Sequence, residues 1–177
     1  MKYIALLLLS IITLSCNAQK QEATAKLNED GDLVGVATKE HFLQPEFKDW
    51  FNYGYNEYNI NTEITAELKS LLQNKKIKAF MGTWCGDSQE QVPYFYRILD
   101  DLDFNFDNLE MIAVNHTKKT PDNLEKGLNI FRVPTFIFYN EKGDELGRIV
   151  EYPIETLEAD MVKILSGKPY THAYENE

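Results

Sequence analysis

A single stretch of the sequence decides the fold: Ile77-Lys78-Ala79-Phe80-Met81-Gly82-Thr83-Trp84-Cys85-Gly86-Asp87-Ser88. Its first five residues form a short apolar run, which predicts a buried strand. From Ser88 to Asp101 the apolar residues recur at helical spacing, and they predict an amphipathic helix directly after that strand. Cys85 is therefore expected between the end of a strand and the beginning of a helix.

This position of Cys85 favours thiolate chemistry. The unpaired N–H groups and the positive dipole end of the following helix stabilise a negative charge on sulfur. Asp87 acts in the opposite direction, because a carboxylate in the same first turn disfavours a second negative charge. A buried, inert thiol is the commoner fate of a free cysteine. Cys85 is thus a candidate nucleophile, with an inert side chain as the alternative.

The chain from residue 63 onward alternates between helical and strand patterns. Strands are expected at 77–81, 111–114, 135–139 and 146–150, and helices at 64–72, 88–101, 121–128 and 154–165. The resulting order α, β, α, β, α, β, β, α implies parallel strands joined by crossovers, with an antiparallel hairpin at one edge. We expect an α/β fold whose central mixed sheet has about four strands and is flanked by helices.

Three motifs in residues 77–165 resemble the thioredoxin superfamily. The segment Gly82–Ser88 aligns with the Trp-Cys-Gly-x-Cys segment of that family, and Pro93 stands where the family kinks its active-site helix. Val133-Pro134-Thr135 matches the cis-proline loop of the family. The resemblance implies a thioredoxin-like fold. More narrowly, the chain is similar to secreted bacterial thioredoxin-like lipoproteins.

The resemblance also implies roles for individual residues. Cys85 would be the exposed nucleophile, Trp84 would pack beside it, and Pro134 would lie across from the sulfur. The backbone of Val133 would pair with an extended peptide segment. Trp84 as a cover of the core and Pro134 as a loop-shaping residue are the structural alternatives. The implied catalytic residues are Cys85, Trp84, Ser88 and Pro134, and the implied substrate-binding residues are Val133, Gly86 and Asp87.

Two departures from the family pattern change the expected chemistry. Ser88 occupies the position of the resolving cysteine, and Ala79 replaces a buried acid that many thioredoxins use as a proton relay. A hydroxyl cannot close a disulfide, so dithiol exchange within one chain is not expected. If the chain is an enzyme, it is a monothiol thiol–disulfide oxidoreductase. Cys85 would then react with protein thiols and disulfides or with a low-molecular-weight thiol, and an external thiol would resolve the product.

Other functions are weighed against this one. A non-catalytic module that docks an extended peptide or partner protein at the Val133-Pro134 edge is the alternative. The motif Cys85–Ser88 is also similar to monothiol glutaredoxins, which can hold an iron–sulfur cluster, but Trp84 and the lack of further cysteine ligands disfavour a cluster. No cofactor is expected. No metal is expected either, since the histidines lack zinc-ligand spacing and His116 is expected in a solvated loop. The three histidines are His41, His116 and His172.

The N-terminus resembles a bacterial lipoprotein signal. A positively charged start precedes an apolar run over 4–14, which is too short to span a bilayer comfortably. Leu14-Ser15-Cys16 resembles a lipobox, although Thr13 stands where leucine is usual. We expect a signal peptide over 1–15 and lipidation of Cys16, which would attach an exported protein to a membrane of the cell envelope or periplasm. Plain secretion, an uncleaved anchor, and an unmodified Cys16 that supplies the missing thiol are the alternatives.

Composition and patterning complete the domain organisation. The chain has 177 residues and a net charge of −10, and a surface this acidic repels phosphate backbones, so nucleic-acid binding is not expected. Polar residues predict a flexible tether over 16–40. Residues 41–62 predict an aromatic-rich helical extension that packs on the domain, and residues 63–170 predict the thioredoxin-like domain. The aromatic residues of the extension are Phe42, Phe47, Trp50, Phe51, Tyr53, Tyr55 and Tyr58.

Overall fold

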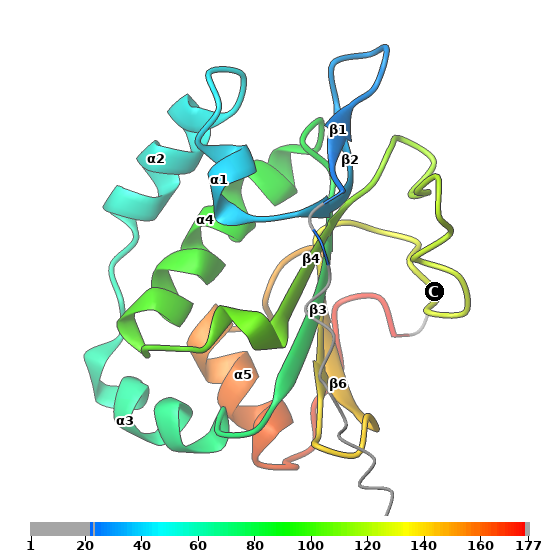
Figure 1. Ribbon diagram of the computed structural model, residues 1–177. Coiled ribbons are helices and arrows are strands. Elements are labelled where there is room, and N and C mark those ends of the chain that lie inside the picture. Colours follow the sequence, from blue (N-terminus) through cyan, green and yellow to red (C-terminus); the bar gives the residue numbers. More distant parts are fainter. Residues whose placement is uncertain (1–21, 23, 176–177) are drawn as a thin grey trace, which may run out of the picture.

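The computed structural model describes residue 22 and residues 24–175, whose strands form one six-stranded mixed sheet (Figure 1). The strands are β1 (Lys26–Leu27), β2 (Leu33–Ala37), β3 (Lys76–Met81), β4 (Leu109–Ala113), β5 (Thr135–Tyr139) and β6 (Glu145–Val150). They lie in the order β1-β2-β4-β3-β5-β6, with β3 and β4 parallel and the other neighbours antiparallel. The mixed sheet flanked by helices that the sequence predicts is confirmed, with six strands.

The additional strands come from the segment expected to be a flexible tether. β2 pairs with β4 within the central sheet, and its residues Leu33 and Val36 are only 1% and 5% exposed. The prediction of a tether over 16–40 is therefore wrong for the strands it contains. The burial of these apolar side chains against the sheet outweighs the polar character of the residues around them.

The polar residues between β1 and β2 form a turn. The side-chain oxygen of Asn28 accepts the backbone N–H groups of Asp30 and Asp32, at 3.0 Å and 2.8 Å. Asn28 N–H in turn donates to the carbonyl oxygen of Asp32 at 2.8 Å. Such side-chain-to-backbone bonds are the reason why asparagine favours turns. The acidic composition of this segment thus reflects a hairpin turn, which we call the N-terminal hairpin together with β1 and β2.

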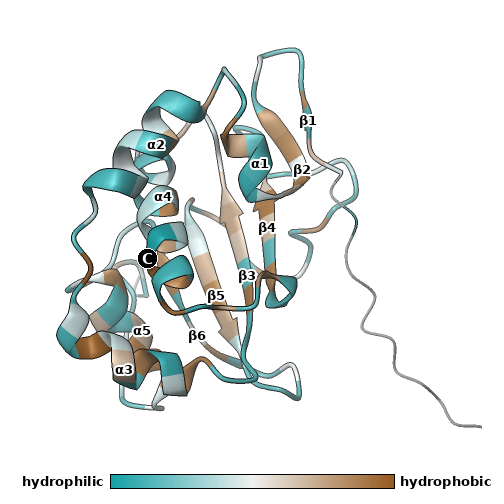
Figure 2. Ribbon diagram, turned by 60° about the vertical axis from the view of Figure 1, so that its left-hand side comes forward, coloured by the Kyte–Doolittle hydropathy of each residue, from teal (hydrophilic) through white to brown (hydrophobic). Residues whose placement is uncertain are grey.

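The helices all lie on one side of the sheet (Figure 1). They are α1 (Lys39–Phe42), α2 (Lys48–Glu57), α3 (Thr62–Leu71), α4 (Gly86–Asp101) and α5 (Leu157–Leu165), with a 3-10 turn at Phe106–Asn108. The opposite side is crossed by the irregular chain between β4 and β5 (Figure 1). Figure 2 shows the central strands as mainly hydrophobic, in keeping with cover on both faces.

The two faces of the sheet have separate cores. On the helix face, buried residues from the helices and the strands form one large cluster that includes Phe42, Phe51, Phe95 and Phe136. On the loop face, Phe80, Ile112, Val114, Val133 and Ile137 form a smaller one. The residues packed against this smaller cluster are Trp84, Cys85, Leu124, Leu128, Ile130 and Tyr139. The candidate thiol therefore belongs to the loop face.

The aromatic extension shares the core of the helix face, as predicted for a helical segment that packs on the domain. Phe42 and Phe51 are buried and stacked, with ring centroids 5.6 Å apart. α2 approaches α4 closely at Gly54, where an added Cβ would lie 3.0 Å from the side chain of Pro93. A larger residue at position 54 would push the two helices apart.

The helix predicted over 121–128 is not formed, and the prediction is wrong there. The segment consists of turns, and its residues Asn123 and Gly127 have positive φ angles of 55° and 80°. The carboxylate of Glu125 accepts both the backbone N–H and the hydroxyl of Thr120, at 3.1 Å and 2.9 Å. These local bonds give the backbone an alternative to the helical pattern. This chain therefore covers the loop face as an irregular connection.

The predicted signal peptide over 1–15 and the predicted lipidation site Cys16 lie outside the described residues. Among the residues that the structure describes, none of the helices combines the length and the apolar character needed to cross a bilayer.

Candidate functional site

Cys85 lies at the N-terminal end of α4, directly after the loop that follows β3. It is the N-cap residue of that helix, with extended backbone angles, and its side chain is partly exposed. Its thiol donates to the carbonyl oxygen of Val133, with an S···O distance of 3.2 Å. Asp87 Oδ2 lies 4.0 Å from the sulfur, on the first turn of the helix. The thiol is thus accessible, placed at a helix N-terminus and held by the loop before β5.

The structure brings the predicted proline loop to this thiol. The Val133–Pro134 peptide bond is cis, as the resemblance implies, and both residues are buried. The carbonyl oxygen of Pro134 accepts the N–H of Glu151 at 2.7 Å, which connects the loop to the end of β6. Val133 O accepts the hydrogen bond from Cys85, so the residue predicted to pair with a peptide also contacts the thiol.

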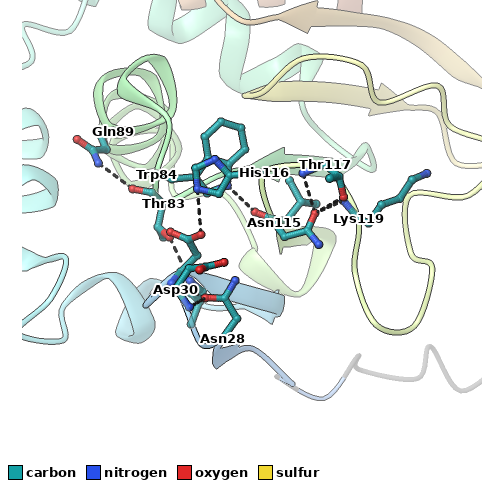
Figure 3. Close-up of polar contacts among 12 residues, drawn as sticks. Asn28, Asp30, Thr83, Trp84, Gln89, Asn115, His116, Thr117 and Lys119 are labelled. Carbon is teal, nitrogen blue, oxygen red and sulfur yellow. Dashed lines mark hydrogen bonds and ion pairs between the residues drawn. The ribbon is translucent and has the colours of Figure 1, made fainter.

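Trp84 flanks Cys85 and is fixed at its polar edge (Figure 3). The indole Nε1–H donates to the carbonyl oxygen of Val114 at 2.9 Å. A Cβ added at Gly82 would come within 2.5 Å of the indole, so only glycine fits beneath the ring. The ring itself is half-buried. Trp84 packs on the loop-face cluster, as does the next residue, Cys85, which agrees with the structural role weighed for the indole.

Ser88 is fully buried, one turn into α4 beyond Cys85. Its hydroxyl oxygen accepts the backbone N–H of Gly82 at 3.2 Å, which ties the helix to the loop before it. The other two motif residues face outward, since Gly86 is exposed and Asp87 is half-buried. The position of the family's second cysteine therefore holds a structural hydroxyl that solvent does not reach.

The sequence did not predict that His116 and Asp32 lie beside Trp84. The imidazole of His116 stacks on the indole, with ring centroids 4.4 Å apart and an interplanar angle of 19°. His116 Nε2 lies 3.3 Å from Asp32 Oδ2. His116 is largely solvated, as expected, with a side chain 62% exposed, but it is also part of the site. No local pattern could have indicated Asp32, because residues 32 and 116 come from segments far apart in the chain.

Two further polar residues brace the loop before Cys85. The hydroxyl of Thr83 accepts the backbone N–H of Leu33, the first residue of β2, at 3.1 Å. Gln89 Nε2 donates to the carbonyl oxygen of Thr83 at 2.7 Å. The loop is therefore held from both sides, by α4 and by the N-terminal hairpin. Within residue 22 and residues 24–175, no group of three or more His, Cys, Asp or Glu side chains lies close enough to hold a metal ion.

Residues 41–165, which carry the site loop, the cis-proline loop and the final helix, match a family model described as Thioredoxin. The chain belongs to the thioredoxin family. The matched range begins after β2, so the N-terminal hairpin with Asp32 lies outside the part that defines this family. The contacts of the hairpin with Thr83 and His116 are consequently features of this chain that family membership does not predict.

Several solved structures are similar to this chain at low sequence identity. A protein of unknown function from Pseudomonas aeruginosa is similar, with a TM-score of 0.55 and 17% identity, over 72% of this chain and 88% of the other. An HIV epitope-scaffold matches with a TM-score of 0.48 and 18% identity, over 72% and 79%. Mitochondrial thioredoxin 3 from Saccharomyces cerevisiae matches with a TM-score of 0.32 and 20% identity, over 55% and 86%. No curated protein was found to match the chain.

Proposed function

We propose that this thioredoxin-family protein carries out monothiol thiol–disulfide exchange through Cys85, with an external thiol as resolver. The observation that carries the proposal is the pairing of an accessible thiol with a buried hydroxyl. Cys85 is partly exposed at the N-terminus of α4, whereas Ser88 is fully buried and bonded to Gly82 N. One sulfur can therefore meet a substrate, and the same chain offers no second sulfur at the family's resolving position.

The exchange proceeds in two balanced steps. The Cys85 thiolate attacks one sulfur of a disulfide, a new S–S bond forms, and the other sulfur leaves with the electron pair of the broken bond. That leaving thiolate takes a proton from water. A second thiolate, from a protein or a low-molecular-weight thiol, then attacks the mixed disulfide and releases Cys85 as a thiolate. The helix N-terminus stabilises the negative charge on sulfur before and after each step.

Glutathione disulfide provides the direct test of this chemistry. The full chain at neutral pH should accumulate a Cys85–glutathione mixed disulfide, detected by mass spectrometry, and reduced glutathione should release it. Iodoacetamide should alkylate Cys85 faster than it alkylates free cysteine, because the thiolate is the reactive form. Reaction no faster than free cysteine, together with no mixed disulfide, would reject the proposal. Cys85→Ser is the control that identifies the sulfur.

Ser88→Cys sharpens the test, because it changes only the resolving position. A thiol at residue 88 could attack the mixed disulfide at Cys85, so the variant should lose bound glutathione without added thiol and form an internal disulfide. Ser88→Ala is the matched control, since it also removes the hydroxyl but supplies no sulfur. It should accumulate the mixed disulfide as the parent does. Equal accumulation in Ser88→Cys and Ser88→Ala would contradict the assignment of residue 88 as the missing resolver.

A second candidate function is a non-catalytic module that docks a partner at the Val133-Pro134 edge. Exposed aromatic side chains near this edge favour it: Phe131, two residues before Val133, is 38% exposed, and Tyr152, next to the Glu151 whose N–H bonds to Pro134 O, is 45% exposed. Cys85→Ala discriminates the two candidates. A docking module keeps its partners in pull-downs of this variant, whereas a monothiol exchanger loses the disulfide-linked ones.

The proposed location is the cell envelope, with a lipid on Cys16 as the membrane anchor. The support is the sequence of the N-terminus alone. Mass spectrometry of the mature chain purified from cells tests it, and the expected N-terminus is a lipid-modified Cys16. An unmodified Cys16 thiol in the mature chain would overturn the anchor and would provide a second thiol that could act on Cys85.

A further inference from the structure

The N-terminal hairpin contacts the loop that carries Cys85. Leu33 N–H donates to the buried hydroxyl of Thr83 at 3.1 Å, so the start of β2 is fastened one residue before Trp84. Asp32, the preceding residue, is 8% exposed. The hairpin thus reaches the site through two successive residues, although it lies outside the range matched by the family model.

Asp32 carries a carboxylate oxygen with an unusual environment. Its Oδ2 is buried and has no hydrogen-bond partner within the described part of the chain. A buried carboxylate oxygen without a hydrogen bond is costly, so a polar group beside it stabilises it. The imidazole of His116 lies next to this oxygen and can stabilise it, with Nε2 3.3 Å from Oδ2. Asp32 therefore acts on the position of the His116 ring.

His116 in turn lies flat on Trp84. The two rings are nearly parallel, at 19°, and their centroids are 4.4 Å apart. The loop that carries His116 is itself held, because Asn115 N–H donates to Lys119 O and Lys118 N–H donates to Asn115 O, at 3.1 Å and 2.8 Å. Figure 3 shows the indole and the imidazole stacked between this loop and the hairpin. The ring of Trp84 is thus fixed on one face as well as at its Nε1 edge.

We propose that Asp32 and His116 are positioning residues for Trp84: the contact between the Asp32 carboxylate and His116 Nε2 holds the imidazole against the indole, and the indole borders the approach to Cys85. The N-terminal hairpin therefore contributes a positioning residue, Asp32, to the site. The consequence for Cys85 rests on the proposed monothiol exchange, whereas the position of Trp84 does not. Loss of the pair loosens the indole and removes the preorganised approach to sulfur.

Trp84 can be observed directly, because the chain has only two tryptophans. In a Trp50→Phe background the remaining emission comes from Trp84, and acrylamide quenching measures the accessibility of its indole. Asp32→Asn and His116→Ala should both raise the quenching constant of Trp84. His116→Phe retains a stacking ring without the contact to the carboxylate, so it should keep quenching low. Because a phenyl ring needs no carboxylate, Asp32→Asn combined with His116→Phe should behave as His116→Phe alone.

Asp30→Asn is the matched control, since it removes the same charge from the same turn at an exposed position. It should leave quenching and reactivity unchanged. Asp32→Asn and His116→Ala should slow mixed-disulfide formation at Cys85 by about two- to fivefold, the size expected of a partly exposed ion pair. His116→Ala alters an exposed side chain, so it reports on the site even if Asp32→Asn were to disturb the hairpin.

The outcomes separate this proposal from the proposed function. Unchanged quenching of Trp84 in both Asp32→Asn and His116→Ala overturns the positioning role, whatever Cys85 does. Raised quenching with unchanged mixed-disulfide rates supports the hold on Trp84 and overturns its consequence for Cys85, because the indole would then move without affecting the sulfur. A parent protein that forms no mixed disulfide rejects the monothiol function instead, and the quenching series still decides whether Asp32 and His116 hold Trp84.

Discussion

The two faces of the sheet are built in different ways. On the helix face, α-helices bury stacked aromatic pairs such as Phe95 and Phe136, whose ring centroids are 4.2 Å apart. On the loop face, a small apolar cluster is covered by turns between β4 and β5, and Trp84 and Cys85 pack against it. The helix face therefore holds the larger hydrophobic core, and the loop face holds the candidate thiol. Connections that need not form regular structure are free to place side chains around a reactive group.

The largest expected effect on stability comes from a cavity in the core of the helix face. Phe95 is fully buried, so Phe95→Ala should lower the free energy of unfolding by about 3–5 kcal/mol. Denaturant titration followed by circular dichroism measures the change. Tyr53→Ala is the control, because Tyr53 is 71% exposed on α2 and its replacement should stay within about 0.5 kcal/mol. A loss below about 1 kcal/mol for Phe95→Ala would contradict the assignment of stability to this face.

A smaller effect on stability is expected from the turns between β4 and β5 that cover the loop face. Leu124 is half-buried against the cluster that includes Cys85. Leu124→Ala should lower the free energy of unfolding by about 1 kcal/mol, because only part of the side chain leaves an apolar environment. The rate of Cys85 alkylation should rise in this variant and stay unchanged in Phe95→Ala when both are compared at the same folded fraction. Equal rates in the two variants would mean that the two faces are not independent.

The smallest effect concerns the stability in acid of the same turns between β4 and β5. Burial alone would raise the pKa of Glu125, but the hydrogen bonds from its own backbone and from Thr120 outweigh burial and lower the pKa below the usual 4.5. A lowered pKa in the folded state means that the carboxylate stabilises the fold above pH 4.5 and loses this contribution as the pH falls through the folded value.

Glu125→Gln should therefore reduce stability by less than about 1 kcal/mol near neutral pH and flatten its decline in acid. Urea titrations of both proteins between neutral pH and pH 3 measure the difference. Glu141→Gln, at an exposed position of the β5–β6 turn, is the control and should keep the parent's profile. A parallel decline in the parent and in Glu125→Gln would show that Glu125 does not contribute to the acid response.

Local patterns predicted the central part of the fold and the first contacts of the site. The apolar run before Gly82 and the helical spacing after Ser88 placed Cys85 between β3 and α4, because strand and helix periodicities are set by neighbouring residues. α4 begins two residues earlier than the spacing indicates, at Gly86. The resemblance to the thioredoxin superfamily, rather than the dipeptide itself, implied a cis bond at Val133-Pro134, and the structure brings the carbonyl oxygen of Val133 to the thiol.

Long-range pairing decided what the sequence could not. The run of residues 33–37 is short and follows a polar turn, so its sequence does not predict a strand. It forms a strand because it pairs with β4. The turns over 121–128 replaced a predicted helix because the Glu125 carboxylate bonds to Thr120 within the folded loop.

The sequence alone predicted a cysteine at the strand–helix junction of a thioredoxin-like fold, with serine at the position of the family's second cysteine. The tertiary structure alone decided what surrounds that cysteine. Asp32, Trp84 and His116 come from three segments separated by many residues, and no periodicity or motif links them. They meet because β2 pairs with β4, which brings Asp32, just before β2, next to His116, just after β4. Such contacts depend on strand pairing rather than on distance along the chain.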